Sequence, residues 1–173
     1  MSIRFTLSVP QTPNARFHSI LQLLVENGVD FVLVGGVAGV LHGAPVNTFD
    51  VDIVHRRTPE NISRMLKALD LLDARYRHSA SRLLRPGESH LSGPGHQLLM
   101  TRFGPLDVLG MIGSNHDYDE LIDGAVPMEL GSGMSVNVIS LPMLIQTKEE
   151  VGQSKDQISL EILKETLRFK DKD

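Results

Sequence analysis

The sequence predicts a single α/β (α+β) domain, and three observations support this fold class. Apolar residues alternate between helical spacing and short continuous runs along the N-terminal half of the chain. In the second half, turn-forming residues separate two pairs of strand-like runs, which is typical of hairpins. The 173 residues suffice for one core, and no internal repeat or second apolar core indicates a boundary. We therefore expect one domain over residues 1–173, with a helical C-terminal segment at about 140–169.

The N-terminal half is predicted to alternate helices and strands, and local signals set several of the boundaries. Asn27-Gly28 stops the first helix, because this pair is common at helix ends. Thr58 provides an N-cap for the third helix and Pro59 occupies its first position. The predicted elements are a helix over residues 14–27, a strand over 30–34, a short helix over 36–42, a strand over 49–54 and a helix from 58 to about 72.

The second half is predicted to add two hairpins and the C-terminal helices. Residues 75–95 contain Arg-Pro-Gly-Glu and Ser-Gly-Pro-Gly, so loops or irregular strands are expected there. Ser140 is a predicted N-cap, and Gly152 is expected to separate the last two helices. The further elements are strands over residues 97–101, 105–109, 126–130 and 134–139, one or two helical turns over 117–122, and helices over 140–151 and about 155–168.

Composition excludes several classes of protein. The chain has no cysteine, which rules out disulfides, zinc–thiolate sites and thiol nucleophiles. No apolar run approaches the length of a membrane span and the first residues do not resemble a signal peptide, so we expect a cytoplasmic protein. The formal net charge of −4 argues against a globally basic nucleic-acid binder.

One stretch nevertheless carries an excess of positive charge. Between His55 and Arg85 only three acidic residues accompany the basic ones. The basic residues are Arg56, Arg57, Arg64, Lys67, Arg75, Arg77, Arg82 and Arg85. Two interpretations stay open: a solvated helix face with a polar loop, or a surface for an anionic partner such as a polyphosphate or RNA.

Asp50 and Asp52 are the strongest indication of chemistry in the sequence. Residues i and i+2 of a strand point to the same side, so the two carboxylates should project together. Like charges this close repel one another, and a divalent metal ion with oxygen ligands relieves that repulsion. Upstream, Gly35-Gly36 ends a strand where a helix begins, and glycines allow the backbone to approach phosphates closely. The pattern favours Mg²⁺-assisted phosphoryl or nucleotidyl transfer.

Such chemistry needs two or three carboxylates, and Asp107 is the best candidate for the third. It is an isolated acid within an apolar strand, Pro105 to Leu109. Burial of a carboxylate without a partner is costly, so a role as a metal ligand or hydrogen-bond acceptor is expected.

These residues resemble the nucleotidyltransferase signature of the DNA polymerase β superfamily, in which a glycine pair precedes an Asp-x-Asp pair. Within it, the chain most resembles the small bacterial AbiEii-like and minimal nucleotidyltransferases. Those proteins carry a His-Gly step after the short helix and a threonine two residues before the first aspartate; here these are His42-Gly43 and Thr48. Near the C-terminus, the helix that Ser140 begins, with Lys148, and then Lys155-Asp156 are similar to the same group.

The resemblance covers residues 31–54, Asp107 and residues 140–163, and it implies a nucleotidyltransferase fold, a mixed β-sheet flanked by helices. It implies an enzyme that moves a nucleoside monophosphate from a nucleoside triphosphate to a protein or RNA acceptor, with a toxin of a toxin–antitoxin pair as one form of that activity. The implied partners are the nucleoside triphosphate, the acceptor, and an antitoxin or dimer mate.

The resemblance also implies roles for individual residues. Asp50 and Asp52 would bind Mg²⁺ or Mn²⁺, and Asp107 would complete the triad as base or third metal ligand. The implied nucleotide-binding residues are Gly35, Gly36, Thr48, Lys148 and Lys155.

A second function class stays open beside the enzyme. Many relatives have an arginine two residues before the threonine, where this chain has Val46, and the extra helical domain of larger relatives is missing. These departures are compatible with a non-catalytic nucleotide-binding or partner-binding module of the same fold. The intact pair of carboxylates argues for the enzyme, because a module has no physical need for two clustered acids.

Overall fold

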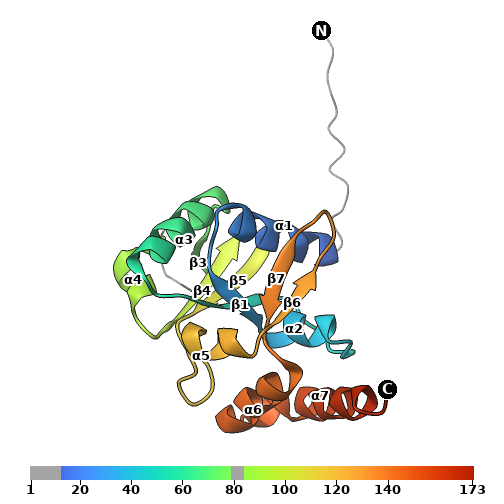
Figure 1. Cartoon of the computed structure of the whole chain (residues 1–173). Helices are drawn as coiled ribbons and strands as arrows, with labels where there is room; N and C mark the ends of the chain where they lie inside the picture. Colours follow the sequence, from blue (N-terminus) through green and yellow to red (C-terminus); the bar gives the residue numbers. More distant parts are fainter. Residues whose placement is uncertain (1–12, 79–83) are drawn as a thin grey trace.

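The computed structural model describes residues 13–78 and 84–173 of the chain, with side chains from residue 16 onward. Helices and strands alternate through the N-terminal half and two helices end the chain (Figure 1). The elements are α1 (Pro13–Glu26), β1 (Phe31–Val34), α2 (Gly35–Leu41), β2 (Val51–His55), α3 (Pro59–Leu71), β3 (Arg75–Tyr76), α4 (Glu88–Ser92), β4 (His96–Thr101), β5 (Gly104–Leu109), α5 (Tyr118–Asp123), β6 (Val126–Glu129), β7 (Ser135–Val138), α6 (Leu141–Val151), a 3₁₀ turn (Ser154–Asp156) and α7 (Gln157–Lys170).

The strands form one mixed sheet, which confirms the predicted fold class. Its seven strands lie in the order β3-β4-β5-β2-β1-β7-β6. The pairs β2–β5 and β1–β7 are parallel, and the other neighbours are antiparallel. The sheet therefore places β1, β2 and β5 side by side at its centre. Gly35-Gly36 directly follow β1, Asp50 directly precedes β2, and Asp52 and Asp107 lie within β2 and β5.

Helices flank this sheet on both sides. In Figure 1, α1 and α3 cover one side of the sheet, whereas α6 and α7 lie together beyond α2 on the opposite side of the molecule. One apolar cluster runs through these layers in the described residues, and it includes Leu24 of α1, Ile53 of β2, Met65 of α3 and Leu163 of α7. Since Leu163 is only 1% exposed, the C-terminal helices are part of this cluster.

The three predicted helix caps occur in the structure, and one helix occurs that was not predicted. The hydroxyls of Thr58 and Ser140 accept hydrogen bonds from backbone N–H groups in the first turns of α3 and α6, and Gly152 ends α6 at a φ of +61°. In residues 75–95 the expected loops and a two-residue strand, β3, occur, but the five-residue helix α4 was not predicted. Arg82 and its neighbours lie outside the described residues.

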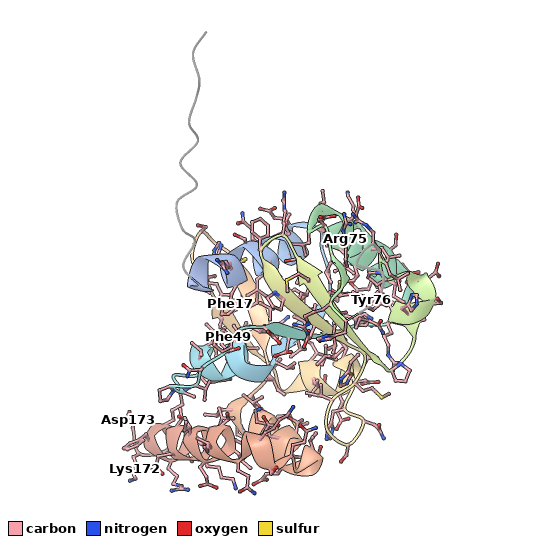
Figure 2. The ribbon with its side chains drawn as sticks, turned by 180° about the vertical axis from the view of Figure 1, so that it is seen from behind. Phe17, Phe49, Arg75, Tyr76, Lys172 and Asp173 are labelled. Atoms are coloured by element: carbon pink, nitrogen blue, oxygen red, sulfur yellow. The ribbon has the colours of Figure 1, made fainter. Side chains whose placement is uncertain are left out.

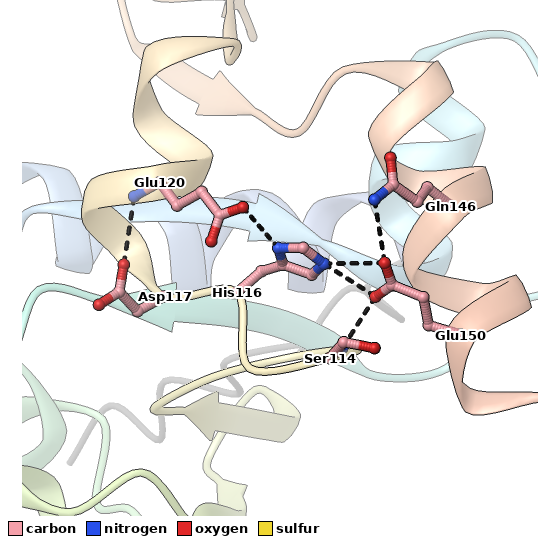
Figure 3. A network of polar contacts seen from close by, with 6 residues as sticks. All are labelled: Ser114, His116, Asp117, Glu120, Gln146 and Glu150. Carbon is pink, nitrogen blue, oxygen red and sulfur yellow. Dashed lines mark hydrogen bonds and ion pairs between the residues drawn. The ribbon is translucent and has the colours of Figure 1, made fainter.

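A network of polar and charged groups links α6 to α5 and the loop before it (Figure 3). His116 precedes α5, and its Nδ1 lies 2.7 Å from Oε1 of Glu120. Its Nε2 lies 2.8 Å from Oε2 of Glu150 on α6, and the Ser114 backbone and the Gln146 side chain donate to the same carboxylate. Both ring nitrogens face carboxylates, so the protonated imidazolium is the form that fits this site.

Removal of the His116 imidazole is expected to weaken the fold within a defined range of pH. Hydrogen bonds to Glu150 and Glu120 raise the pKa of His116 above 6.5, so its contribution is complete below that pH and is lost as the pH rises through the raised pKa. Hydrogen bonds from Gln146, His116 and Ser114 lower the pKa of Glu150 from 4.5 to about 2, so its contribution is complete above pH 4.5 and is lost as the pH falls from there towards 2. The difference in melting temperature between wild type and His116→Gln should therefore be largest at about pH 5–6 and shrink in alkali. His18→Gln is the control; a difference that grows with pH would contradict the charged network.

Candidate functional site

Three carboxylates converge at the centre of the sheet, because strand alternation and register both place them there. Val51 and Ile53 of β2 are fully buried on one face, so Asp52 between them points to the opposite face. Asp50 precedes Asp52 by two residues and shares that side. In the parallel pair of β2 and β5, Asp52 is the register partner of Asp107, so the two side chains lie next to each other on the same face.

The glycine pair is required by the closeness of these side chains. Gly35 has a φ of +67°, and a Cβ at this position would lie 2.2 Å from Oδ2 of Asp52. A Cβ on Gly36 would lie 2.5 Å from Oγ1 of Thr48. Any larger residue would displace a predicted site side chain, so the turn and the carboxylates form one unit.

A pocket of about 230 Å³ opens beside this turn. Most of the predicted site residues line it, together with residues from the C-terminal helices. The lining is Gly35, Gly36, Gly39, Val46, Asn47, Thr48, Phe49, Asp50, Asp52, Lys148, Asp156, Ser159 and Leu163. Phe49, labelled in Figure 2, is 79% exposed and so places its ring at the rim of the pocket. Asp107, on the neighbouring strand, is not part of this lining.

Burial and the charges of neighbouring groups raise the pKa of two of the three carboxylates, Asp52 and Asp107. Burial, followed by the charges of Asp107 and Asp50, raises the pKa of Asp52 to about 7, and the charge of Lys148 opposes this. Burial also raises the pKa of Asp107, against the opposing effect of Arg77. The site thus carries more negative charge than its own cations balance.

Arg77 is a charged residue at the site that sequence reasoning did not place there. It follows β3, and its guanidinium lies 2.5 Å from Oδ1 of Asp107 and 3.4 Å from Oδ2 of Asp50. The sequence showed only its membership in the basic stretch, since its partners lie 27 and 30 residues away along the chain. The position of Arg77 at the site depends on the order of the strands in the sheet, and local sequence patterns do not reveal that order.

Several other residues of the basic stretch form ion pairs or hydrogen bonds with other parts of the chain. Arg75 and Arg85 pair with Asp73, Arg85 also pairs with Asp70, and Arg56 lies near Asp30 and Asp119. Arg64 donates to the backbone of Gly28. Most of the described arginines of this stretch therefore have partners within the molecule, which favours the interpretation as a solvated helix face with a polar loop over a surface for an anionic partner.

The donor set of the site fits one divalent cation. Asp50 and Asp52 present oxygen ligands to the pocket, and Mg²⁺ is commonly held by one or two carboxylates together with substrate phosphates. The pKa of Asp52 is raised by burial and then by repulsion from Asp107 and Asp50, and a bound cation would oppose both effects. Among residues 13–78 and 84–173, no group of three or more His, Asp or Glu side chains is arranged as a set of metal ligands. Asp107 holds the Arg77 guanidinium instead.

The two predicted lysines occupy different environments. Lys148 lies in the pocket lining, is 22% exposed, and its Nζ is 3.8 Å from Oδ1 of Asp156. Lys155 is exposed in the 3₁₀ turn and is not part of that lining. Packing of α6 against α2 thus brings one lysine to the glycine turn and leaves the other in solvent.

Replacement of Lys148 by methionine is expected to lower kcat/KM for a nucleoside triphosphate by about 10- to 100-fold. The effect should appear mainly as a higher KM, because a charge-assisted contact to phosphate is lost. Lys155→Met is the matched control, since it removes the same charge from an exposed position seven residues further on. Steady-state kinetics of both variants checks this; equal losses would show that the distinction drawn from the pocket is wrong.

Comparisons with known structures concern the fold of the chain. No protein-family model and no curated protein sequence matches the chain. A protein of Thermotoga maritima described as a nucleotidyltransferase is 18% identical, with a TM-score of 0.54, over 83% of this chain and 87% of its own. The enzyme ANT(2″)-Ia, solved with adenylyl-2″-tobramycin, is 17% identical, with a TM-score of 0.57, over 91% and 90%.

A third structure extends the same comparison. The lincosamide antibiotic adenylyltransferase LnuA, solved with lincomycin, is 14% identical, with a TM-score of 0.55, over 86% of this chain and 94% of its own. At these identities the likeness establishes a shared architecture. The chain therefore has the nucleotidyltransferase fold, and its chemistry must be argued from its own side chains.

Proposed function

We propose that the protein is a metal-dependent nucleotidyltransferase, which moves a nucleoside monophosphate from a nucleoside triphosphate to a hydroxyl acceptor. The observation that carries the proposal is that Asp50 and Asp52 line one pocket together with Gly35 and Gly36, with Asp52 directly against Gly35. Carboxylates placed next to a backbone turn without side chains suit a triphosphate with its cation. The nucleotidyltransferase fold supports this reading.

The residues divide the work of an in-line displacement. Bound Mg²⁺ or Mn²⁺ would neutralise phosphate charge between Asp50 and Asp52. Gly35, Gly36 and Lys148 would position the triphosphate. The acceptor oxygen then forms a bond to the α-phosphorus while the bond from that atom to the oxygen bridging to the β-phosphorus breaks, so pyrophosphate leaves. Asp107 is the base or third ligand in this proposal; as a base it takes the acceptor's proton.

The acceptor is best argued from a second pocket. A cavity of about 500 Å³ shares Val46, Asn47 and Thr48 with the site and is otherwise mainly apolar. Its size is that of a pocket for a small organic molecule. Two of the compared enzymes act on antibiotics, whereas an RNA acceptor would draw on a basic stretch whose described arginines are largely paired. We favour a small hydroxylated acceptor over the protein or RNA that the sequence suggested.

The AbiEii-like assignment, the toxin role and an antitoxin or dimer mate belong to this proposal as its more specific form. They predict that the chain arrests growth when expressed alone and that co-expression of a neighbouring partner relieves the arrest.

None of the helices in the described parts of the chain combines the length and hydropathy of a membrane-spanning helix.

Labelled nucleotides test the proposal directly. The protein is incubated with Mg²⁺ or Mn²⁺ and with each triphosphate, labelled at either the α- or the γ-phosphate, plus aminoglycosides and lincosamides, total RNA, or cell protein. Nucleotidyl transfer places the α-label on an acceptor and releases the γ-label as pyrophosphate, and EDTA abolishes both. Acceptors that take the γ-label would identify a phosphotransferase. Metal-independent nucleotide binding without transfer to any acceptor would favour the non-catalytic module.

A further inference from the structure

Arg77 lies in the same row of the sheet as the carboxylates. Its backbone N–H donates to the carbonyl of Leu98 in β4, Leu98 is the register partner of Asp107 in β5, and Asp107 is the partner of Asp52 in β2. Register partners project from the same face of a sheet. The Arg77 side chain thus spans the width of β4 to reach the site.

The guanidinium is held firmly in that position. The Arg77 side chain is 17% exposed and that of Asp107 only 13%. Just before it, the Tyr76 hydroxyl donates to Oε1 of Gln97 and fixes the strand from which Arg77 extends. The Nε of Arg77 is buried without a hydrogen-bond partner among the described residues. Such burial is unfavourable for a charged group, so the two carboxylates are the contacts that keep the guanidinium in place.

This contact places the Arg77 guanidinium at one oxygen of each of two carboxylates, where a second metal ion would otherwise find ligands. Two-metal sites place their ions about 3.5–4 Å apart and use carboxylates on both. Here Oδ1 of Asp107 is bound to the Arg77 guanidinium, and Oδ2 of Asp50 is the second oxygen that the guanidinium contacts. Asp52 remains free of Arg77 and faces the pocket with Asp50.

We propose that Arg77 is a positioning residue that takes the place of a second cation, so that the site binds one divalent ion, at Asp50 and Asp52, instead of two. This inference rests on the proposed function, because it concerns the same carboxylates. It leaves Asp107 as a carboxylate held in a fixed orientation by a permanent charge, and so assigns Asp107 to proton acceptance rather than to metal ligation.

Manganese stoichiometry tests the proposal without any turnover. Free Mn²⁺ is measured by electron paramagnetic resonance during titration of the nucleotide-free protein. Wild type and Arg77→Lys should bind one ion per chain, and Arg77→Gln should bind two, because both carboxylates become available. Arg75→Gln, which removes a neighbouring guanidinium that pairs with Asp73, is the control and should bind one.

Further variants keep the test decisive if Arg77→Gln folds poorly. Arg77→Gln combined with Asp107→Asn removes both charges of the pair and should return the stoichiometry to one. Two ions in the wild type, or one ion in a folded Arg77→Gln, would overturn the proposal. Loss of label transfer with one Mn²⁺ bound would count against the proposed function alone, so the two ideas fail separately.

Discussion

Asp52→Asn is expected to lower nucleotidyl transfer by about 10³-fold or more, because it removes a charge that the reaction needs at the cation and the phosphates. Asparagine has nearly the same shape, so the close approach of this side chain to Gly35 is kept. The loss should therefore appear mainly in kcat, with little change in secondary structure.

The same substitution is expected to stabilise the metal-free protein at neutral pH. The pKa of Asp52 is raised from 3.8 to about 7, mainly by burial and by the charges of Asp107 and Asp50. A raised carboxyl pKa means that the ionised form is disfavoured in the folded state, so wild-type stability falls as the pH rises from about 4 to 7. An asparagine does not ionise, and the variant should lack this fall.

Melting temperatures between pH 4 and 8, with and without Mg²⁺, measure the second effect, and α-labelled nucleotide measures the first. Asp119→Asn, on the exposed surface beside Arg56, is the control that should change neither. Full transfer activity in Asp52→Asn would exclude this site as the catalytic one. Lower stability of the variant at pH 7 would show that Asp52 has a structural role.

Gly35→Ala is expected to lower nucleotidyl transfer more than an alanine at the other glycine of the turn. Residues other than glycine at a φ of +67° carry a backbone strain of about 1–2 kcal/mol. In addition, the new Cβ would lie 2.2 Å from Oδ2 of Asp52, so the carboxylate or the turn must move. A displacement of about 1 Å in a site of this kind costs about 10²-fold in rate, and we expect at least that loss of transfer.

Gly131→Ala separates the two causes. Gly131 has a φ of +83° in the β6–β7 turn, and a Cβ there would meet no atom within 4 Å. The control therefore carries backbone strain alone, and it should lower the melting temperature while transfer stays near the wild-type rate. Equal loss of transfer in both variants would mean that Gly35 acts only through stability.

Local signals were sufficient for most elements and for the central pair of acids. Thr58, Ser140 and Gly152 mark helix boundaries through contacts within a few residues, so the sequence contains the complete signal. Asp50 and Asp52 share a face because strand geometry alternates side chains, whatever the rest of the fold does. The short helix α4 was missed, because five residues carry too little periodicity to be recognised.

Which charged residues complete the site was decided by tertiary structure. Lys148 and Lys155 are equivalent in the sequence as cations of the C-terminal segment, and only the packing of α6 against α2 places Lys148 in the pocket. Asp107 meets Asp52 only through the parallel register of β2 and β5. Arg77 follows β3 and reaches Asp107 of β5, two positions away in the sheet, and Asp50 before β2, three positions away. The sequence by itself thus determined the fold class and the glycine–aspartate pair, whose geometry is local. The counter-charge and the lysine depend on strand order and helix packing, which bring together residues far apart along the chain.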